Sequence, residues 1–81
     1  MATTKIKNTK YTWGDVVQVK IDSPKKYRLD SIGSVCGITE IDNQIMVDLY
    51  NKPMGTIVYT VEFTDGNSMI IPECFLKFLE N

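Results

Sequence analysis

The apolar residues of this chain fall into short alternating runs, and no run repeats at the spacing of a long amphipathic helix. In residues 15–22, Val17, Val19 and Ile21 fall on one face of an extended chain. This period of two predicts a half-buried strand. Pro24 ends the strand, because proline has no N–H to donate to a ladder.

A loop over residues 23–32 separates this strand from a second extended run over residues 33–41. Gly37 inside the second run predicts a bulge or a sharp bend, which helps a small sheet to curl. Residues 42–56 fit either a continuation of the strand or one helical turn. Pro53 then breaks the chain.

The clearest pattern is a hairpin over residues 57–71, where two apolar runs flank Asp65-Gly66. An Asp-Gly pair between such runs predicts a tight turn, since glycine supplies the positive φ. Pro72 and Glu73 then open the last segment. A proline at the first helical position followed by an acid predicts a short helical turn.

These elements predict a mostly β protein, a small five-stranded barrel or curled sheet with a short C-terminal helical turn. A chain of 81 residues is long enough for one domain with a thin core. We expect residues 1–11 to be a flexible basic arm and residues 12–81 to be the folded domain. The expected core positions are Val17, Val19, Ile21, Val35, Ile38, Tyr59, Val61, Phe63, Ile71, Phe75 and Leu76.

The order of these signals resembles the SH3-like small barrels over residues 12–79. It is similar to ribosome- and transcription-associated barrels, to the barrel domain of the nitrile hydratase β subunit, and to related stand-alone bacterial barrels. The resemblance implies a fold without catalytic residues, because the metal centre of nitrile hydratases belongs to another subunit. The motifs that carry it are Gly14-Asp15-x-Val17-x-Val19, Gly33-Ser34-Val35, Tyr59-x-Val61-x-Phe63-x-Asp65-Gly66 and Ile71-Pro72-Glu73-x-x-Leu76.

Charge is distributed unevenly although the net charge is only −1. Residues 1–28 carry seven basic and two acidic side chains, a net of +5, and residues 29–81 carry two basic and eight acidic side chains, a net of −6. This asymmetry indicates either an anionic partner or lysines that solvate a tail and a loop. A pI of about 5.2 argues against a typical nucleic-acid-binding domain.

The residues needed for catalysis or metal binding are sparse. The chain has no histidine to activate Cys36 or Cys74, and these cysteines are expected to be buried and reduced unless they meet in space as a disulfide. Glu40 and Asp42 are too few to hold a metal ion. No glycine-rich phosphate loop is present. We therefore expect no enzyme activity, no cofactor and no metal.

The candidate binding residues combine basic charge with aromatic rings. Tyr and Trp bury a large area with few rotatable bonds, so they suit a partner surface. Trp13 also suits a second role, as a cap on one open end of a barrel. The residues expected at a partner surface are Tyr11, Trp13, Lys25, Lys26, Tyr27, Arg28 and Tyr50.

Two functions fit these residues. The first is a non-catalytic protein-binding or adaptor module, for example one that neutralises a toxin or regulates an enzyme. The alternative is an RNA- or single-stranded-DNA-binding barrel that uses the basic loop 23–28. A sheet edge that pairs with a partner strand or with a second copy is a third form of interaction. The chain has no apolar run long enough for a membrane helix and no secretory signal, which favours the cytoplasm.

Overall fold

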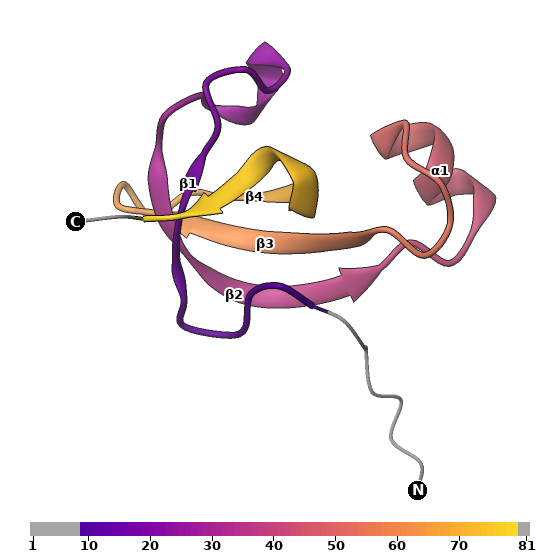
Figure 1. Ribbon diagram of the computed structural model, residues 1–81, viewed down its shortest axis with the longest axis horizontal. Coiled ribbons are helices and arrows are strands. Elements are labelled where there is room, and N and C mark those ends of the chain that lie inside the picture. Colours follow the sequence, from indigo (N-terminus) through magenta and orange to yellow (C-terminus); the bar gives the residue numbers. More distant parts are fainter. Residues whose placement is uncertain (1–8, 80–81) are drawn as a thin grey trace, which may run out of the picture.

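The computed structural model describes residues 9–79 as a five-stranded antiparallel sheet with one α-helix (Figure 1). The mostly β prediction is confirmed, whereas most of the expected N-terminal arm lies outside the described residues. None of the described helices is long and apolar enough to cross a membrane. In chain order the elements are β1 (Val16–Val19), η1 (Lys25–Tyr27), β2 (Ile32–Glu40), α1 (Gln44–Tyr50), β3 (Ile57–Phe63), β4 (Ser68–Pro72), η2 (Glu73–Phe75) and β5 (Leu76–Phe78).

The strand order is β4-β3-β2-β1-β5, so β4 and β5 are the two edges of the sheet. They are joined by η2, whose three residues rise only about 6 Å as a 3-10 turn. Across a flat sheet, the four strand spacings between the edges would amount to about 19 Å. The sheet is therefore strongly curled. No ladder joins β4 to β5 within residues 9–79, so the sheet is not closed.

Two glycine signals in the sequence correspond to real features of the sheet. The β2–β3 register shifts between Val35 and Gly37, which confirms the predicted bulge. At the predicted hairpin, Gly66 has a φ of 87° and donates its N–H to the carbonyl of Phe63 at 3.0 Å. The N–H of Phe63 in turn donates to the carbonyl of Asn67 at 2.8 Å, which closes the turn.

The core lies on the concave face of the sheet, and most of its members were expected. Ile38 and Phe75 are only partly buried against it. The assignment of Ile21 to the core was wrong, since its side chain is 73% exposed. The reason is that β1 ends at Val19, so the alternation does not continue through the following turn. The buried cluster is Tyr11, Val17, Val19, Tyr27, Val35, Ile57, Tyr59, Val61, Phe63, Ile71 and Leu76.

Tyr11 belongs to the core, although the sequence suggested that it lies at a partner surface. Its side chain is buried, and its hydroxyl donates to the carbonyl of Leu76 at 2.9 Å. Its ring meets those of Tyr59 and Phe78 edge-on, with centroids 5.2 and 4.7 Å away. Tyr11 thus belongs to the folded domain although we expected it in the arm. Trp13 is 65% exposed and does not cap the core.

The open assignment of residues 42–56 is settled by α1. The side-chain oxygen of Asn43 accepts the N–H of Met46 at 3.0 Å and caps the start of the helix. Asn51 ends it in the left-handed conformation, which asparagine tolerates well. Of its seven residues none is buried. Figure 1 shows α1 beyond the ends of β2 and β3.

Candidate binding groove

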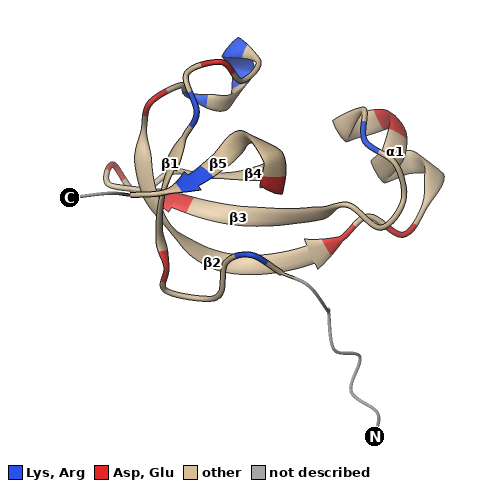
Figure 2. Cartoon of the chain, in the orientation of Figure 1, with Lys and Arg blue, Asp and Glu red and all other residues tan. Residues whose placement is uncertain are grey.

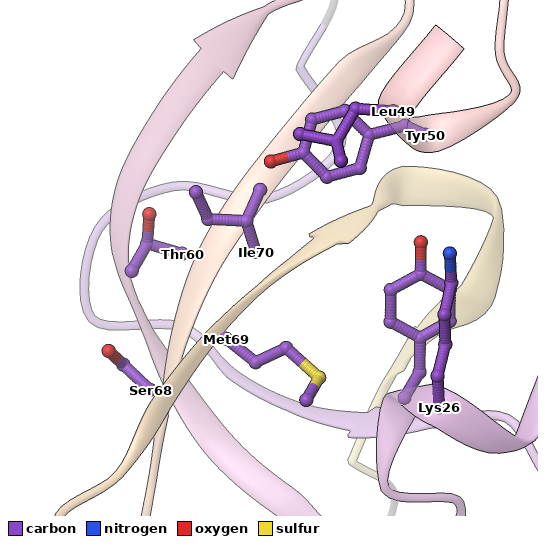
Figure 3. Close-up of a pocket in the computed structure, with 8 residues that line it drawn as sticks. Lys26, Leu49, Tyr50, Thr60, Ser68, Met69 and Ile70 are labelled. Atoms are coloured by element: carbon purple, nitrogen blue, oxygen red, sulfur yellow. The ribbon is translucent and has the colours of Figure 1, made fainter. Parts of the chain in front are cut away.

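An open groove of about 600 Å³ follows the free edge of β4 and lies between η1 and α1 (Figure 3). We call it the β4 groove. A hollow of about 160 Å³ adjoins it and shares Lys26, Tyr27 and Tyr50 with it. The residues that line the β4 groove are Lys26, Tyr27, Leu49, Tyr50, Thr60, Ser68, Met69 and Ile70.

The η1 wall of the groove is held in place by the loop that follows β1. Pro24 accepts the N–H of Tyr27 at 3.0 Å, which closes the 3-10 turn. The ring of Tyr27 is buried and packs against Phe75 of η2, with centroids 5.4 Å apart. Ser23 is buried below it, and its hydroxyl donates to the carbonyl of Phe75 at 3.4 Å. Tyr27 is therefore a fixed part of the wall.

The opposite wall comes from the end of α1, where Leu49 and Tyr50 face the groove. Asn51 then reverses the chain, and Lys52 extends back across the adjoining hollow. Its ammonium nitrogen lies 4.7 Å from the centroid of the Phe75 ring, a cation–π distance. Lys52, in the segment that follows α1, thus contacts Phe75 of η2.

The floor of the groove is the edge strand β4. Ile70 pairs with Thr60 on one face of the sheet, and Met69 pairs with Val61 on the other. Side chains from both faces line the groove, so it wraps around the strand edge. In Figure 3, Ile70 and Thr60 lie on one side of the strand and Met69 extends on the other, toward Lys26.

The groove is electrically positive in an otherwise acidic body. Lys26 and Lys52 are the charged side chains that line it and the adjoining hollow, and none of the described lining residues is acidic. The ammonium nitrogen of Lys26 lies 5.1 Å from the Tyr27 ring centroid. Figure 2 shows basic positions at η1 and directly after α1.

Arg28 was also expected at the partner surface, but its contacts stabilise the fold. Its guanidinium lies 2.8 Å from the carboxylate of Asp65 and 4.5 Å from the centroid of the Phe63 ring. This hydrogen bond holds the pKa of Asp65 well below its usual range. Arg28 thereby ties the loop after β1 to the β3–β4 hairpin.

The structure divides the seven expected residues into three groups. It brings Lys26, Tyr27 and Tyr50 together in the β4 groove. Lys25 and Trp13 are exposed but do not line it. The buried Tyr11 and the paired Arg28, described above, serve the fold.

Sequence reasoning did not place Leu49, Met69 and Ile70 in the site. The sequence carries no signal for Leu49, because its 62% exposure depends on how α1 packs in the folded chain. It carries none for Met69 and Ile70 either, because whether a strand lies at the edge depends on pairings between distant segments.

The two cysteines are unpaired and exposed, so the expectation that they are buried was wrong. Cys36 lies at the bulge of β2, between the two positions where the register shifts. Cys74 lies in η2, which has no buried residue.

Comparison with known proteins does not assign the chain, because no protein-family model, curated protein or solved structure matches it.

Proposed function

We propose that this protein is a small non-catalytic module that binds another protein through the β4 groove. The observation that carries the proposal is that α1 leaves two of its large apolar side chains exposed. Ile45 and Leu49 are 79% and 62% exposed, although a thin core would gain from covering them. Contiguous exposed apolar surface of this kind is typical of interaction sites.

The groove beside α1 supplies anchors of the type that interfaces favour. Tyr50, Met69 and Ile70 offer aromatic and flexible apolar surface, and Lys26 adds a charge at the rim. A volume of about 600 Å³ lies within the range of roughly 300–1,000 Å³ that binding pockets usually have. The groove therefore accommodates one or two large side chains of a partner.

We also propose that the curled sheet is an SH3-like barrel. Three features support this: β1 lies between β2 and β5, β2 bends at a glycine bulge, and η2 carries the chain between the two edges. Such barrels often bind in a groove near the first long loop, which is where η1 lies. A cytoplasmic role in neutralising a toxin or regulating an enzyme fits this architecture.

Nucleic-acid binding is the less favoured alternative. Lys25 and Lys26 are exposed, but the Arg28 guanidinium is paired with Asp65. The body of the chain is acidic, which repels phosphate.

The proposal is tested by photo-crosslinking from inside the groove. The full-length chain carries p-benzoylphenylalanine in place of Tyr50, and a matched control carries it in place of the exposed Trp13. In lysate of the source cell, we expect position 50 to crosslink to one protein and position 13 not to do so. Equal crosslinking from both positions would contradict a groove-specific partner.

A second variant separates binding from folding. Leu49→Asp should leave the free energy of unfolding within about 0.5 kcal/mol, because the side chain is exposed. It should abolish the crosslink from position 50. Nuclease-sensitive crosslinking, together with salt-dependent binding of single-stranded DNA that is lost in Lys25→Ala/Lys26→Ala, would replace the proposal with the nucleic-acid alternative.

A further inference from the structure

The edge strand β4 lacks the features that usually prevent an edge from pairing with another chain. Natural edge strands carry charged residues, prolines or bulges for this purpose. Residues 68–71 read Ser-Met-Ile-Ile and contain no charge, and the proline comes only at position 72. At the other edge, by contrast, β5 has only three residues and carries Lys77 at its centre.

The direction of the backbone groups of β4 follows from the hairpin. Phe63 donates its N–H to Asn67, so these two residues form a hydrogen-bonded pair. Pairs alternate along an antiparallel ladder, and the Thr60–Ile70 and Glu62–Ser68 pairs are then of the non-hydrogen-bonded kind. The N–H and C=O groups of Ser68 and Ile70 therefore point away from β3, toward the free edge. Within residues 9–79, no backbone group outside the sheet pairs with them.

The groove has the shape that an added strand requires. A strand beside β4 would send alternate side chains to opposite faces of the sheet. On one face they would meet Met69 and Lys26, and on the other Ile70, Leu49 and Tyr50. In strand addition, backbone hydrogen bonds supply affinity and side-chain pockets supply specificity. The β4 groove offers backbone groups at its floor and side-chain walls on both faces.

Charge indicates which strand would fit. Lys26 and Lys52 line the groove and its adjoining hollow, with no acidic side chain among the described lining residues. A segment with carboxylates beside apolar residues is complementary to this surface. The β4 strand of a second copy offers no carboxylate within Ser68–Pro72, so it is a poorer match.

We propose that the partner protein adds an extended segment, in which apolar and acidic residues alternate, as a sixth strand along β4. This inference rests on the proposed function and specifies how the β4 groove is used. Ser68 and Ile70 supply the backbone hydrogen bonds, the apolar side chains enter between Tyr50 and Ile70, and a carboxylate meets Lys26.

The first experiment uses defined peptides and the full-length chain. The probe is a synthetic peptide of about seven residues in which valine and isoleucine alternate with glutamate. One matched peptide carries lysine for glutamate, and another is methylated at every backbone nitrogen. We expect the acidic peptide to bind and to slow amide exchange at Ser68 and Ile70. Backbone methylation should weaken binding roughly tenfold or more, and the lysine peptide should bind more weakly than the acidic one.

The second experiment changes the strand itself. Ile70→Pro removes an N–H that faces away from β3, so the sheet should survive as it does at other edge prolines. Ile70→Pro should therefore abolish peptide binding. Ile70→Ala keeps the N–H and should retain part of the binding affinity. Lys26→Ala should weaken binding of the acidic peptide roughly two- to five-fold, which is the effect of losing an exposed ion pair. If Ile70→Pro does not fold, the methylated peptide still tests the backbone contacts without any variant.

Several outcomes would overturn the inference. If the acidic peptide does not bind, or if the lysine peptide binds more tightly, the charge of the proposed strand is wrong. If the methylated and unmethylated peptides bind equally, or if amide exchange at Ser68 and Ile70 is unchanged, the proposed backbone hydrogen bonds do not form. Self-association that is lost in Ile70→Pro would assign the edge to a second copy instead. The crosslink from position 50 does not depend on these peptides. It therefore shows whether the proposed function stands when strand addition fails.

Discussion

The hydroxyl of Tyr59 donates a hydrogen bond of 2.6 Å to the carboxylate of Glu73, and the same oxygen accepts the backbone N–H groups of Lys10 and Tyr11. One buried oxygen thus joins β3, η2 and the segment before β1. The N–H of Lys10 also donates to Glu73 at 2.9 Å. This network holds Tyr11 in the core.

The first prediction concerns this hydroxyl. Tyr59→Phe should destabilise the protein by about 1–3 kcal/mol, because the N–H of Tyr11 loses its partner in a buried site. Urea denaturation of the full chain measures the effect. Tyr50→Phe is the matched control, since Tyr50 lies in the groove and is only partly buried. Equal stability of the two variants would contradict the role given to the network.

The second prediction is a loss of stability in alkali. Burial, followed by the hydrogen bond with Glu73, raises the pKa of Tyr59 from 10.0 to about 12. The folded state therefore holds this proton more tightly than the unfolded state does. Its contribution is fully present below pH 10 and is lost as the pH rises through about 12.

The difference between wild type and Tyr59→Phe isolates this loss from lysine titration. Burial also raises the pKa of Tyr11, which adds to the alkaline loss in both proteins. Unfolding free energies between pH 9 and about pH 12 should fall more steeply in wild type than in the variant. Parallel curves would show that Tyr59 does not carry the effect.

The third prediction tests the close approach of β2 and β3 at Gly33. A methyl group there would lie 2.5 Å from the carbonyl oxygen of Glu62 and 2.7 Å from a methyl of Val61. Because the carbonyl belongs to the backbone of a paired strand, it cannot move aside. Gly33→Ala should cost about 1–3 kcal/mol of stability, measured by thermal unfolding. Ser34→Ala, next along the strand, should cost much less.

The fourth prediction concerns the ion pair between Arg28 and Asp65. The pair is exposed, so its coupling in a double-mutant cycle of Arg28→Ala and Asp65→Ala should weaken in high salt. Arg28 lowers the pKa of Asp65 below its ordinary 3.8, so the coupling is present above pH 3.8 and fades as the pH falls below it. A coupling that persists in acid and in salt would contradict this assignment. Arg28→Ala should also leave binding in the β4 groove intact, because Arg28 does not line it.

Local patterns in the sequence predicted much of the sheet for identifiable reasons. Alternation located β1 to β4, since the side-chain period of a strand is a property of the chain itself. Asp65-Gly66 and Gly37 marked a turn and a bulge because glycine adopts backbone conformations that other residues avoid. The sequence did not decide between a strand and a helical turn at α1, because the two asparagine caps enclose only seven residues and so short a segment has no clear helical periodicity.

The candidate site was predicted only in part. Lys26, Tyr27 and Tyr50 were selected for charge and aromaticity, and they do line one groove. Tyr11 was selected on the same grounds but is buried, because its hydroxyl finds a partner in Leu76, 65 positions along the chain. Composition indicates what a side chain can do, and distant partners determine whether it remains exposed.

The sequence by itself determined the strands, the hairpin turn, the bulge and the uneven charge, since each depends on residues close together in the chain. The tertiary structure decided which strand became an edge, which tyrosines were buried and which lysine faced the groove. These depend on pairings between segments such as Ser68–Pro72 and Ile57–Phe63, and on the curl that brings η1 and α1 to the two sides of β4. The burial of Tyr11 and the free edge of β4 are set by such long-range contacts, which no local pattern encodes.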